Sequence, residues 1–345
     1  MIQWLLLPVV IILSLALTEW LRRYALAKKI IDIPNARSSH SIPTPRGGGL
    51  AIVLIFLLSL PCLAWFQLAQ VSALLAIGGS GAIVAIIGFV DDHGHVAARW
   101  RLLGHFAAAA WALLWLGGLP EINIFGFTVY LGWAGHLLTA VFIVWMLNLY
   151  NFMDGIDGIA SIETITVCVG VGVLYWVSGF DRIMWLPFLL AGATSGFLFW
   201  NFPPARIFMG DAGSGFLGVM LGVFAIQAAW VSPQLFWATL ILLGVFIVDA
   251  TVTLLRRCVR GDKVYEAHRS HAYQFAARYF GSHFTVIMAV SAINMLWLFP
   301  VSLSVVLFGL DGALGLVLAY CPLILLAVKF HAGELENTTG HSGAR

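Results

Sequence analysis

The chain has 345 residues, of which 61% are hydrophobic and only 10% are charged, and its mean hydropathy is +0.95. Soluble domains are about 45–50% apolar and about 25% charged, so this composition excludes an ordinary soluble globular protein. No basic helix stands clear of the apolar runs, so no nucleic-acid partner is expected. The four cysteines, Cys62, Cys168, Cys258 and Cys321, are scattered without a CxxC pair, which argues against disulfides and a zinc site.

Apolar runs of about 20 residues, the length that crosses a bilayer as a helix, recur along the chain. Period-two alternation, the mark of a membrane barrel, is absent from the sequence. The first run has no small-residue cleavage site, which favours a retained span. We predict an all-α integral membrane protein in which residues 1–330 form one transmembrane domain and residues 331–345 a polar, disordered tail. Its eleven spans are expected near 2–21, 48–66, 71–90, 102–118, 133–150, 159–177, 184–201, 213–231, 234–254, 284–308 and 311–330.

Basic residues are distributed unevenly between alternate loops. If the N-terminus faces the periplasm, the loops after odd-numbered spans are cytoplasmic, and only Arg182 of the Lys and Arg residues lies outside. The positive-inside rule favours this orientation. The longest outer connection, residues 119–132, is expected to form a small hairpin around Gly126.

Acidic and amide side chains gather at the inner ends of the odd-numbered spans. In NLYNFMDGIDGIA, residues 148–160, a spacing of three places four of them on one face of a helix: Asn148, Asn151, Asp154 and Asp157. Further clusters follow the third, seventh and ninth spans: FVDDHGHVAARWR with Asp91, Asp92, Arg99 and Arg101, FPPARIFMGDAGSG with Asp211, and the loop with His268, Arg269 and His271.

These clusters predict a phosphoryl-transfer site. Carboxylate and amide oxygens suit Mg²⁺, which usually bridges one or two carboxylates to substrate phosphates. Nearby Arg and His side chains would hold phosphate oxygens. Each cluster alone has a structural explanation, because acidic pairs often end a helix in solvent and glycines such as Gly155 and Gly158 supply unusual dihedral angles. Their convergence on one face favours the site.

In chain order, DIPNARSSHSIPTPRGGG, VDD, NLYNFMDGIDG, FMGDAGS and the HRSH loop resemble the polyprenyl-phosphate N-acetylhexosamine-1-phosphate transferases, glycosyltransferase family 4. The resemblance covers nearly the whole chain. It implies an enzyme of the bacterial inner membrane with a cytoplasmic active site. The implied reaction transfers an N-acetylated amino-sugar 1-phosphate from a UDP-sugar to undecaprenyl phosphate and releases UMP, with Mg²⁺, or alternatively Mn²⁺, as cofactor.

The resemblance also implies residue roles. Asp211 would ligate the metal, Phe208 would stack on the uracil, and Asp91 would be the base for the lipid phosphate. The implied catalytic residues are Asp91, Asp92, Asn151 and Asp154. The implied substrate-binding residues are His40, Arg46, Arg99, Arg101, Asn148, Asp157, Phe208, His268, Arg269 and His271.

The last inner loop departs from the family pattern. Many relatives carry HxHH, whereas this chain has His271, Ala272, Tyr273 and Gln274, and His268 stands where an Asp is usual. The HRSHAYQ form resembles the transferases that initiate O-antigen and lipopolysaccharide synthesis. The resemblance therefore implies GlcNAc or a 6-deoxy sugar as the transferred group, and the sequence leaves the choice open.

The alternative hypothesis is a secondary transporter with an ion or substrate site at the inner face, because transporters also bury Asp and Asn in a bundle. The charges here gather at the predicted interface and not at the midplane. Even Glu163 and Asp249 lie within about two turns of the inner ends of their spans. The sequence leaves open a homodimer and a two-step route through an aspartyl intermediate.

Overall fold

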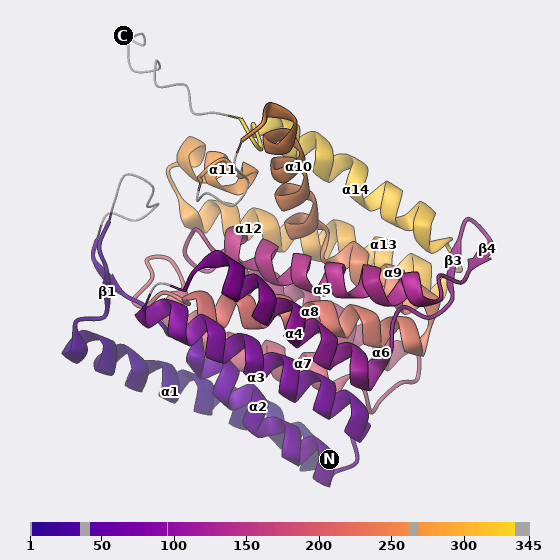
Figure 1. The fold of residues 1–345 in the computed structure, drawn as a ribbon, viewed down its shortest axis with the longest axis horizontal. Coiled ribbons are helices and arrows are strands. Elements are labelled where there is room, and N and C mark those ends of the chain that lie inside the picture. Colours follow the sequence, from indigo (N-terminus) through magenta and orange to yellow (C-terminus); the bar gives the residue numbers. More distant parts are fainter. Residues whose placement is uncertain (1, 35–41, 95, 263–267, 335–345) are drawn as a thin grey trace.

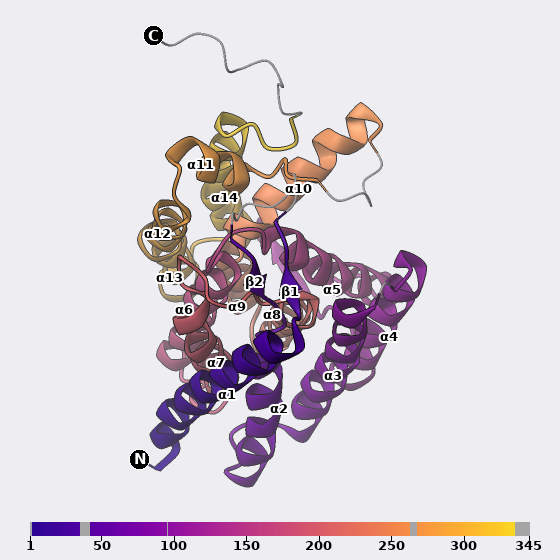
Figure 2. The same cartoon turned by 90° about the vertical axis from the view of Figure 1, so that its left-hand side faces the viewer.

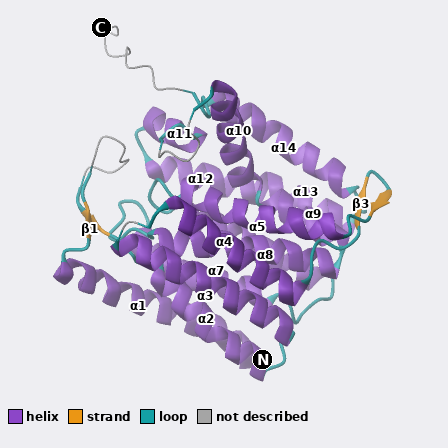
Figure 3. Ribbon diagram, viewed as in Figure 1, coloured by secondary structure: helices purple, strands orange, loops and turns teal. Residues whose placement is uncertain are grey.

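The structure is a computed structural model that describes residues 2–34, 42–94, 96–262 and 268–334 (Figure 1). Almost all regular structure in these residues is helical, and the strands form two short hairpins (Figure 3). The prediction of an all-α bundle is confirmed. The elements are η1 (Ile2–Leu5), α1 (Leu6–Lys28), β1 (Ile31–Asp32), β2 (Thr44–Pro45), α2 (Leu50–Trp65), α3 (Val71–His93), α4 (Ala98–Leu116), β3 (Ile122–Ile124), β4 (Phe127–Val129), α5 (Trp133–Met153), α6 (Ile159–Val177), α7 (Trp185–Asn201), α8 (Asp211–Val231), α9 (Pro233–Leu242), α10 (Gly244–Arg260), α11 (Ala272–Phe280), α12 (His283–Ile293), η2 (Asn294–Leu298), α13 (Phe299–Leu307) and α14 (Gly312–Lys329).

Helix α8 is the centre of the bundle. All of its residues from Ala212 to Ala229 are buried, and it contacts α3, α5 and α9, as expected for a helix that is apolar on every side. A Cβ atom on Gly88 of α3 would lie 2.6 Å from the Cα atom of Ala212, so only glycine permits this approach. The contact brings the acidic end of α3 onto the first turn of α8.

Every predicted span coincides with a helix or a broken helix. Seven helices of the described chain are long and apolar enough to cross a membrane, or eight spans if α9 and α10 count as one. Helices α2 and α7 have only 16 and 17 residues, fewer than the roughly 20 of a typical crossing. Eleven crossings and the orientation therefore remain predictions.

The ninth predicted span, residues 234–254, is not a continuous helix. Helices α9 and α10 meet at Leu243 with a bend of 68°. Helix α10 is amphipathic and ends in a basic turn that contains Arg257 and Arg260, and in Figure 1 it runs across the direction of α5 and α8. The predicted apolar run is helical, but its second half, which belongs to α10, does not continue in the direction of α9. The tenth span contains a second irregularity, the π-helical turn η2.

The two ends of the bundle differ. The N-terminus and the β3–β4 hairpin lie at one end and the β1–β2 hairpin at the other (Figures 1 and 2). The β3–β4 register pairs Ile124 with Phe127 around the turn that contains Gly126, so the predicted hairpin is confirmed. The β1–β2 hairpin pairs Asp32 with Thr44.

The connection after α10, predicted to be cytoplasmic, contains a helix that apolar runs do not predict. Helix α11 begins where the Asp249 carboxylate accepts the backbone N–H groups of Ala272 and Tyr273, at 2.9 and 3.0 Å. Residues 331–334, the start of the predicted disordered tail, are ordered: Gly333 donates its N–H to the carbonyl oxygen of Ser270 at 2.6 Å. Residues 335–345 lie outside the described part.

We expect single cysteines to report the orientation. In a variant with Cys62, Cys258 and Cys321 replaced by serine, a cysteine at the exposed Thr128 of β4 should react with an impermeant thiol reagent on intact cells. A cysteine at Tyr279 of α11, whose side chain is 79% exposed, should react only after the membrane is opened. The reverse pattern would invert the predicted topology.

Candidate active site

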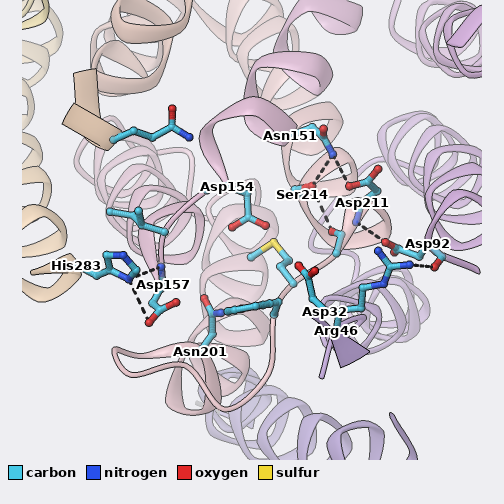
Figure 4. A pocket seen from close by; sticks show the side chains of 16 residues that line it. Asp32, Arg46, Asp92, Asn151, Asp154, Asp157, Asn201, Asp211, Ser214 and His283 are labelled. Atoms are coloured by element: carbon cyan, nitrogen blue, oxygen red, sulfur yellow. Dashed lines mark hydrogen bonds and ion pairs between the residues drawn. The ribbon is translucent and has the colours of Figure 1, made fainter. Parts of the chain in front are cut away.

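A polar cavity of about 270 Å³ opens at the end of the bundle that carries β1 (Figure 4). It lies where the ends of α3, α5 and α7, the start of α8, and α11 and α12 meet. Its lining consists of Asp32, Arg46, Asp92, Asn151, Asp154, Gly155, Ile156, Asp157, Asn201, Phe208, Met209, Gly210, Asp211, Ser214, Gln274 and His283. Five of these residues are aspartates and one is an arginine, so the cavity is strongly acidic.

The first turn of α8 is fixed by Asp92. The two Asp92 carboxylate oxygens accept the backbone N–H groups of Asp211 and Ala212 at 3.1 and 3.2 Å. These donors belong to the first turn, where helix N–H groups lack intrahelical partners. Gly210 has φ +80°, and a Cβ atom there would lie 2.8 Å from an Asp92 oxygen. Asp92 thus sets the position of the Asp211 backbone.

The Asp211 side chain is held from the opposite helix. Asn151 of α5 donates its Nδ2–H groups to Asp211 Oδ1 at 2.9 Å and to Ser214 Oγ at 3.2 Å. Arg46, which follows β2, donates to the backbone oxygen of Asp92 at 2.6 Å. The Asp211 carboxyl group also lies within hydrogen-bonding reach of the Asp91 side chain, and its Oδ2 lies 3.8 Å from Arg101 Nη1.

Asp154 lies between the Asp211 group and a second polar pair (Figure 4). Burial, followed by the charges of Asp211, Asp157 and Asp92, raises the pKa of Asp154 well above its ordinary value. Like charges crowded in this way mark a candidate functional site.

Replacement of Asp154 by Asn should stabilise the cation-free protein at neutral pH. A carboxyl group whose pKa is raised by folding stabilises the fold fully below its unfolded pKa, near 4, and loses that contribution as the pH rises towards the folded pKa. With a chelator present, the melting temperature of Asp154→Asn should exceed that of the wild type at pH 7, and the difference should shrink towards about pH 4. Asp157→Asn, in the same loop, is the control. It should not melt higher than the wild type at any pH, because the Asp157 carboxylate already accepts the Ala205 N–H at 3.1 Å and an amide oxygen can accept the same donor. A wild-type melting temperature for Asp154→Asn at every pH would contradict the prediction.

The second polar pair joins α12 to the loop before α6. His283 Nδ1 lies 3.3 Å from Asp157 Oδ2. Asn201 accepts the Gly158 N–H at 3.0 Å and donates to the Ile207 carbonyl oxygen at 3.0 Å. These contacts shape the part of the cavity that contains the Phe208 ring.

A second cavity of about 200 Å³ adjoins the first and shares Asn151 and Asp211 with it. Its far wall consists of apolar residues of α3, α4 and α5, together with Asp91, Arg101, His105 and Asn148. Arg101 donates to Asp91 Oδ2 and the Val96 N–H to Asp91 Oδ1. Asn148 donates to Val144 of its own helix. This cavity combines one guanidinium group with an apolar wall.

Comparison with known proteins decides the family. Residues 74–229 match glycosyl transferase family 4. The chain is 32% identical over 296 residues to decaprenyl-phosphate N-acetylglucosaminephosphotransferase of Mycolicibacterium smegmatis, which covers 73% of this chain and 71% of the relative. This protein belongs to glycosyl transferase family 4.

Two further relatives agree. The probable undecaprenyl-phosphate N-acetylglucosaminyl 1-phosphate transferase of Bacillus subtilis is 27% identical over 330 residues, 94% of this chain and 90% of that protein. The phospho-N-acetylmuramoyl-pentapeptide-transferase of Moorella thermoacetica is 35% identical over 198 residues, 53% of this chain and 61% of the relative. The similarity to family 4 enzymes thus extends well beyond the matched segment, which ends within α8.

Most of the residues predicted from the resemblance to family 4 line one of the two cavities: Arg46, Asp91, Asp92, Arg101, Asn148, Asn151, Asp154, Asp157, Phe208 and Asp211. Arg99 does not, and its guanidinium group lies over the ring of Trp100. His40 lies outside the described residues.

The HRSH loop is placed differently from the expectation. His271 is 2% exposed and pairs with Asp249 through Nδ1 at 3.2 Å. It is the N-cap of α11 and lines neither cavity. Burial, followed by the charges of His271 and Arg257, lowers the pKa of His268 to about 3, so this side chain is neutral near pH 7. Arg269 lines a third cavity beside α11, which shares Gln274 and His283 with the main cavity.

Sequence reasoning did not include Asp32, Asn201, Ser214, Gln274 or His283 among the site residues, although all line the main cavity. Asp32 and Ser214 lie inside the family motifs, and Gln274 occupies the last position of the HxHH pattern. His283 has no motif signal, because only the packing of α12 brings it to Asp157.

A divalent cation fits the acidic cavity. Among the described residues, no group of three or more His, Cys, Asp and Glu side chains could hold a metal ion. Mg²⁺ is commonly bound by one or two carboxylates, with waters and substrate phosphates as its other ligands. Asp211 and Asp154 would be its ligands, since both Asp92 oxygens already accept backbone N–H groups and Asp157 accepts the Ala205 N–H.

Proposed function

We propose that this protein transfers an N-acetylhexosamine 1-phosphate from a UDP-sugar to a polyprenyl phosphate, with release of UMP, at a Mg²⁺-dependent site on the cytoplasmic face of a bacterial inner membrane. One observation carries the proposal. The acidic cavity and the half-apolar cavity share Asn151 and Asp211. A donor diphosphate in the first cavity and an acceptor phosphate in the second would therefore lie next to each other, on either side of Asp211. Two of the relatives are named as transferases of undecaprenyl phosphate and decaprenyl phosphate.

The acidic cavity suits the nucleotide donor. Its Phe208 ring offers a stacking surface for a base, while Asp157 and Asn201 offer acceptors and a donor for the base edge. The lining aspartates would repel a diphosphate, and cations would offset that repulsion. Mg²⁺ held by Asp211 and Asp154 would supply that charge and polarise the transferred phosphoryl group.

The second cavity suits the lipid acceptor. Its apolar wall fits an isoprenoid chain, and Arg101 provides a cation for the phosphate oxygens. Asp91 holds Arg101 in place through their ion pair. An acceptor phosphate beside Arg101 would face the Asp211 side of the donor cavity, as in-line attack on the donor diphosphate requires.

The protein's own contribution is positioning. Asp92 fixes the first turn of α8, Asn151 orients the Asp211 carboxylate, and the buried walls limit water that would hydrolyse the donor. The acceptor oxygen is already anionic near pH 7, because phosphomonoesters have a second pKa near 6. Direct attack therefore requires little proton removal.

Release of UMP tests the proposal. Purified protein, undecaprenyl phosphate and Mg²⁺ should release UMP with one or more members of a panel of UDP-N-acetyl sugars, and release should stop without the lipid. The panel also tests the sugar that we propose from the HRSHAYQ loop, GlcNAc or a 6-deoxy amino sugar of O-antigen or lipopolysaccharide synthesis. Failure with every UDP-sugar, combined with solute uptake into vesicles, would favour the transporter alternative.

A further inference from the structure

A buried carboxyl group lies outside both cavities. Glu163 of α6 is 0% exposed, and Asn294, the first residue of η2, is 2% exposed. Asn294 Nδ2 donates to Glu163 Oε2 at 2.7 Å and to Thr166 Oγ1 at 2.8 Å. Among the described residues, no Lys, Arg or His side chain forms an ion pair with Glu163. An ionised carboxylate without a cation is unfavourable at this depth.

Two acceptor atoms of this pair lack partners. Glu163 Oε1 and Asn294 Oδ1 are both buried and receive no hydrogen bond, whereas Asn294 Nδ2 already uses both of its hydrogens. Two unpaired acceptors on neighbouring side chains need one donor between them. A proton on Glu163 Oε1 is the smallest change that supplies it, because a carboxylic acid donates through one oxygen and accepts through the other.

The pair lies where two helices are irregular. Asn294 begins the π-helical turn η2, and π-turns frequently occur at functional sites. The Glu163 carboxyl group also faces the backbone N–H of Phe246, in the first turn of α10 after the 68° bend. First-turn N–H groups have no partner within their own helix. One side chain of α6 therefore contacts both irregular turns.

Helix α10 leads from this pair to the acidic cavity. Three residues beyond Phe246, Asp249 caps α11 and pairs with His271. Tyr273 of α11 then donates its hydroxyl to the backbone oxygen of Phe152 at 3.0 Å, and Gln274 lines the donor cavity. A chain of contacts thus links the start of α10 to the place where α11 meets the end of α5.

We propose that Glu163 is protonated and forms a reciprocal hydrogen-bonded pair with Asn294, and that this neutral pair is a positioning element that fixes the α9–α10 bend and, through Asp249, the α11 wall of the donor cavity. Glu163 touches no substrate. Its carboxyl group accepts from Asn294 Nδ2 through Oε2 and donates to Asn294 Oδ1 through Oε1.

Infrared spectroscopy of the full-length protein in lipid tests the protonation without any substrate, so its result is independent of the proposed function. The difference spectrum of wild type minus Glu163→Gln should contain the C=O stretch of a protonated carboxyl group, and Asn294→Leu should shift that band. Glu121→Gln, at an exposed outer position, is the matched control and should change no such band. If the difference spectrum instead contains the bands of an ionised carboxylate and no band of a protonated carboxyl group, the proposal is overturned.

Rescue by the conservative variant tests the positioning role. Glu163→Gln keeps one donor and one acceptor, so UMP release should stay within about threefold of wild type. Glu163→Leu and Asn294→Leu should lower it by about tenfold or more if they fold, because the pair is then broken. Activity of Glu163→Gln as low as that of Glu163→Leu would overturn the proposal. If Na⁺ raises the melting temperature of the wild type and not that of Glu163→Gln, Glu163 binds a cation as a carboxylate, and the proposal is overturned as well.

Discussion

Replacement of Asp211 by Asn is expected to abolish UMP release without unfolding the protein. The amide keeps the shape of the side chain, and its oxygen can still accept from Asn151 Nδ2. The Asp211 backbone N–H remains bonded to Asp92. Only the negative charge that would hold Mg²⁺ is lost. Because a metal contributes several kcal/mol to transition-state stabilisation, turnover should fall by about a thousandfold or more.

Two measurements separate this effect from misfolding. Added Mg²⁺ should raise the melting temperature of the wild type, since it binds only the folded site, and this rise should be much smaller in Asp211→Asn. The control is Asp311→Asn at the opposite end of the bundle, where the side chain caps α14 through the Leu314 N–H and an amide oxygen can replace the carboxylate oxygen. Near-normal activity of Asp211→Asn at saturating Mg²⁺ would remove Asp211 from the metal site.

Replacement of Asp91 by Asn is expected to impair the acceptor step equally at all pH values. Both Asp91 oxygens are engaged, one by Arg101 and the other by the Val96 N–H. A carboxylate paired with arginine has little tendency to take a proton. When Asp91 loses its negative charge, Arg101 is no longer held in a fixed position. The KM for polyprenyl phosphate should therefore rise by about tenfold or more, with kcat changed less.

The pH profile distinguishes this role from the base predicted from the family resemblance. If Asp91 removes a proton from the acceptor, Asp91→Asn should recover activity between about pH 6 and 9, because the phosphate then ionises unaided. We expect a flat profile of reduced height. Arg101→Gln should add little to Asp91→Asn, because the two residues act as a unit. Arg99→Gln is the matched control, since Arg99 lines neither cavity. Recovery at high pH would return Asp91 to the role of base.

The sequence by itself determined the class of fold and the chemical content of the site. Run length and apolarity are local properties, so the positions of the spans and of the outer hairpin around Gly126 could be predicted without tertiary contacts. The acidic motifs recur at the inner ends of alternate spans, and this regularity predicted the convergence of Asp92, Asn151 and Asp211. The structure brings these residues together through hydrogen bonds.

Tertiary structure decided the features that depend on contacts between distant positions. Asp92 caps the first turn of α8 although 119 positions separate it from Asp211, and His283 reaches Asp157 across 126 positions. Hydropathy predicts one straight span for residues 234–254, because it does not register the bend at Leu243. His271 is likewise buried because of a contact with a distant residue: the Asp249 carboxylate pairs with the His271 ring and accepts the backbone N–H of Ala272. A side chain's neighbours across helices are set by packing, and no local pattern specifies them.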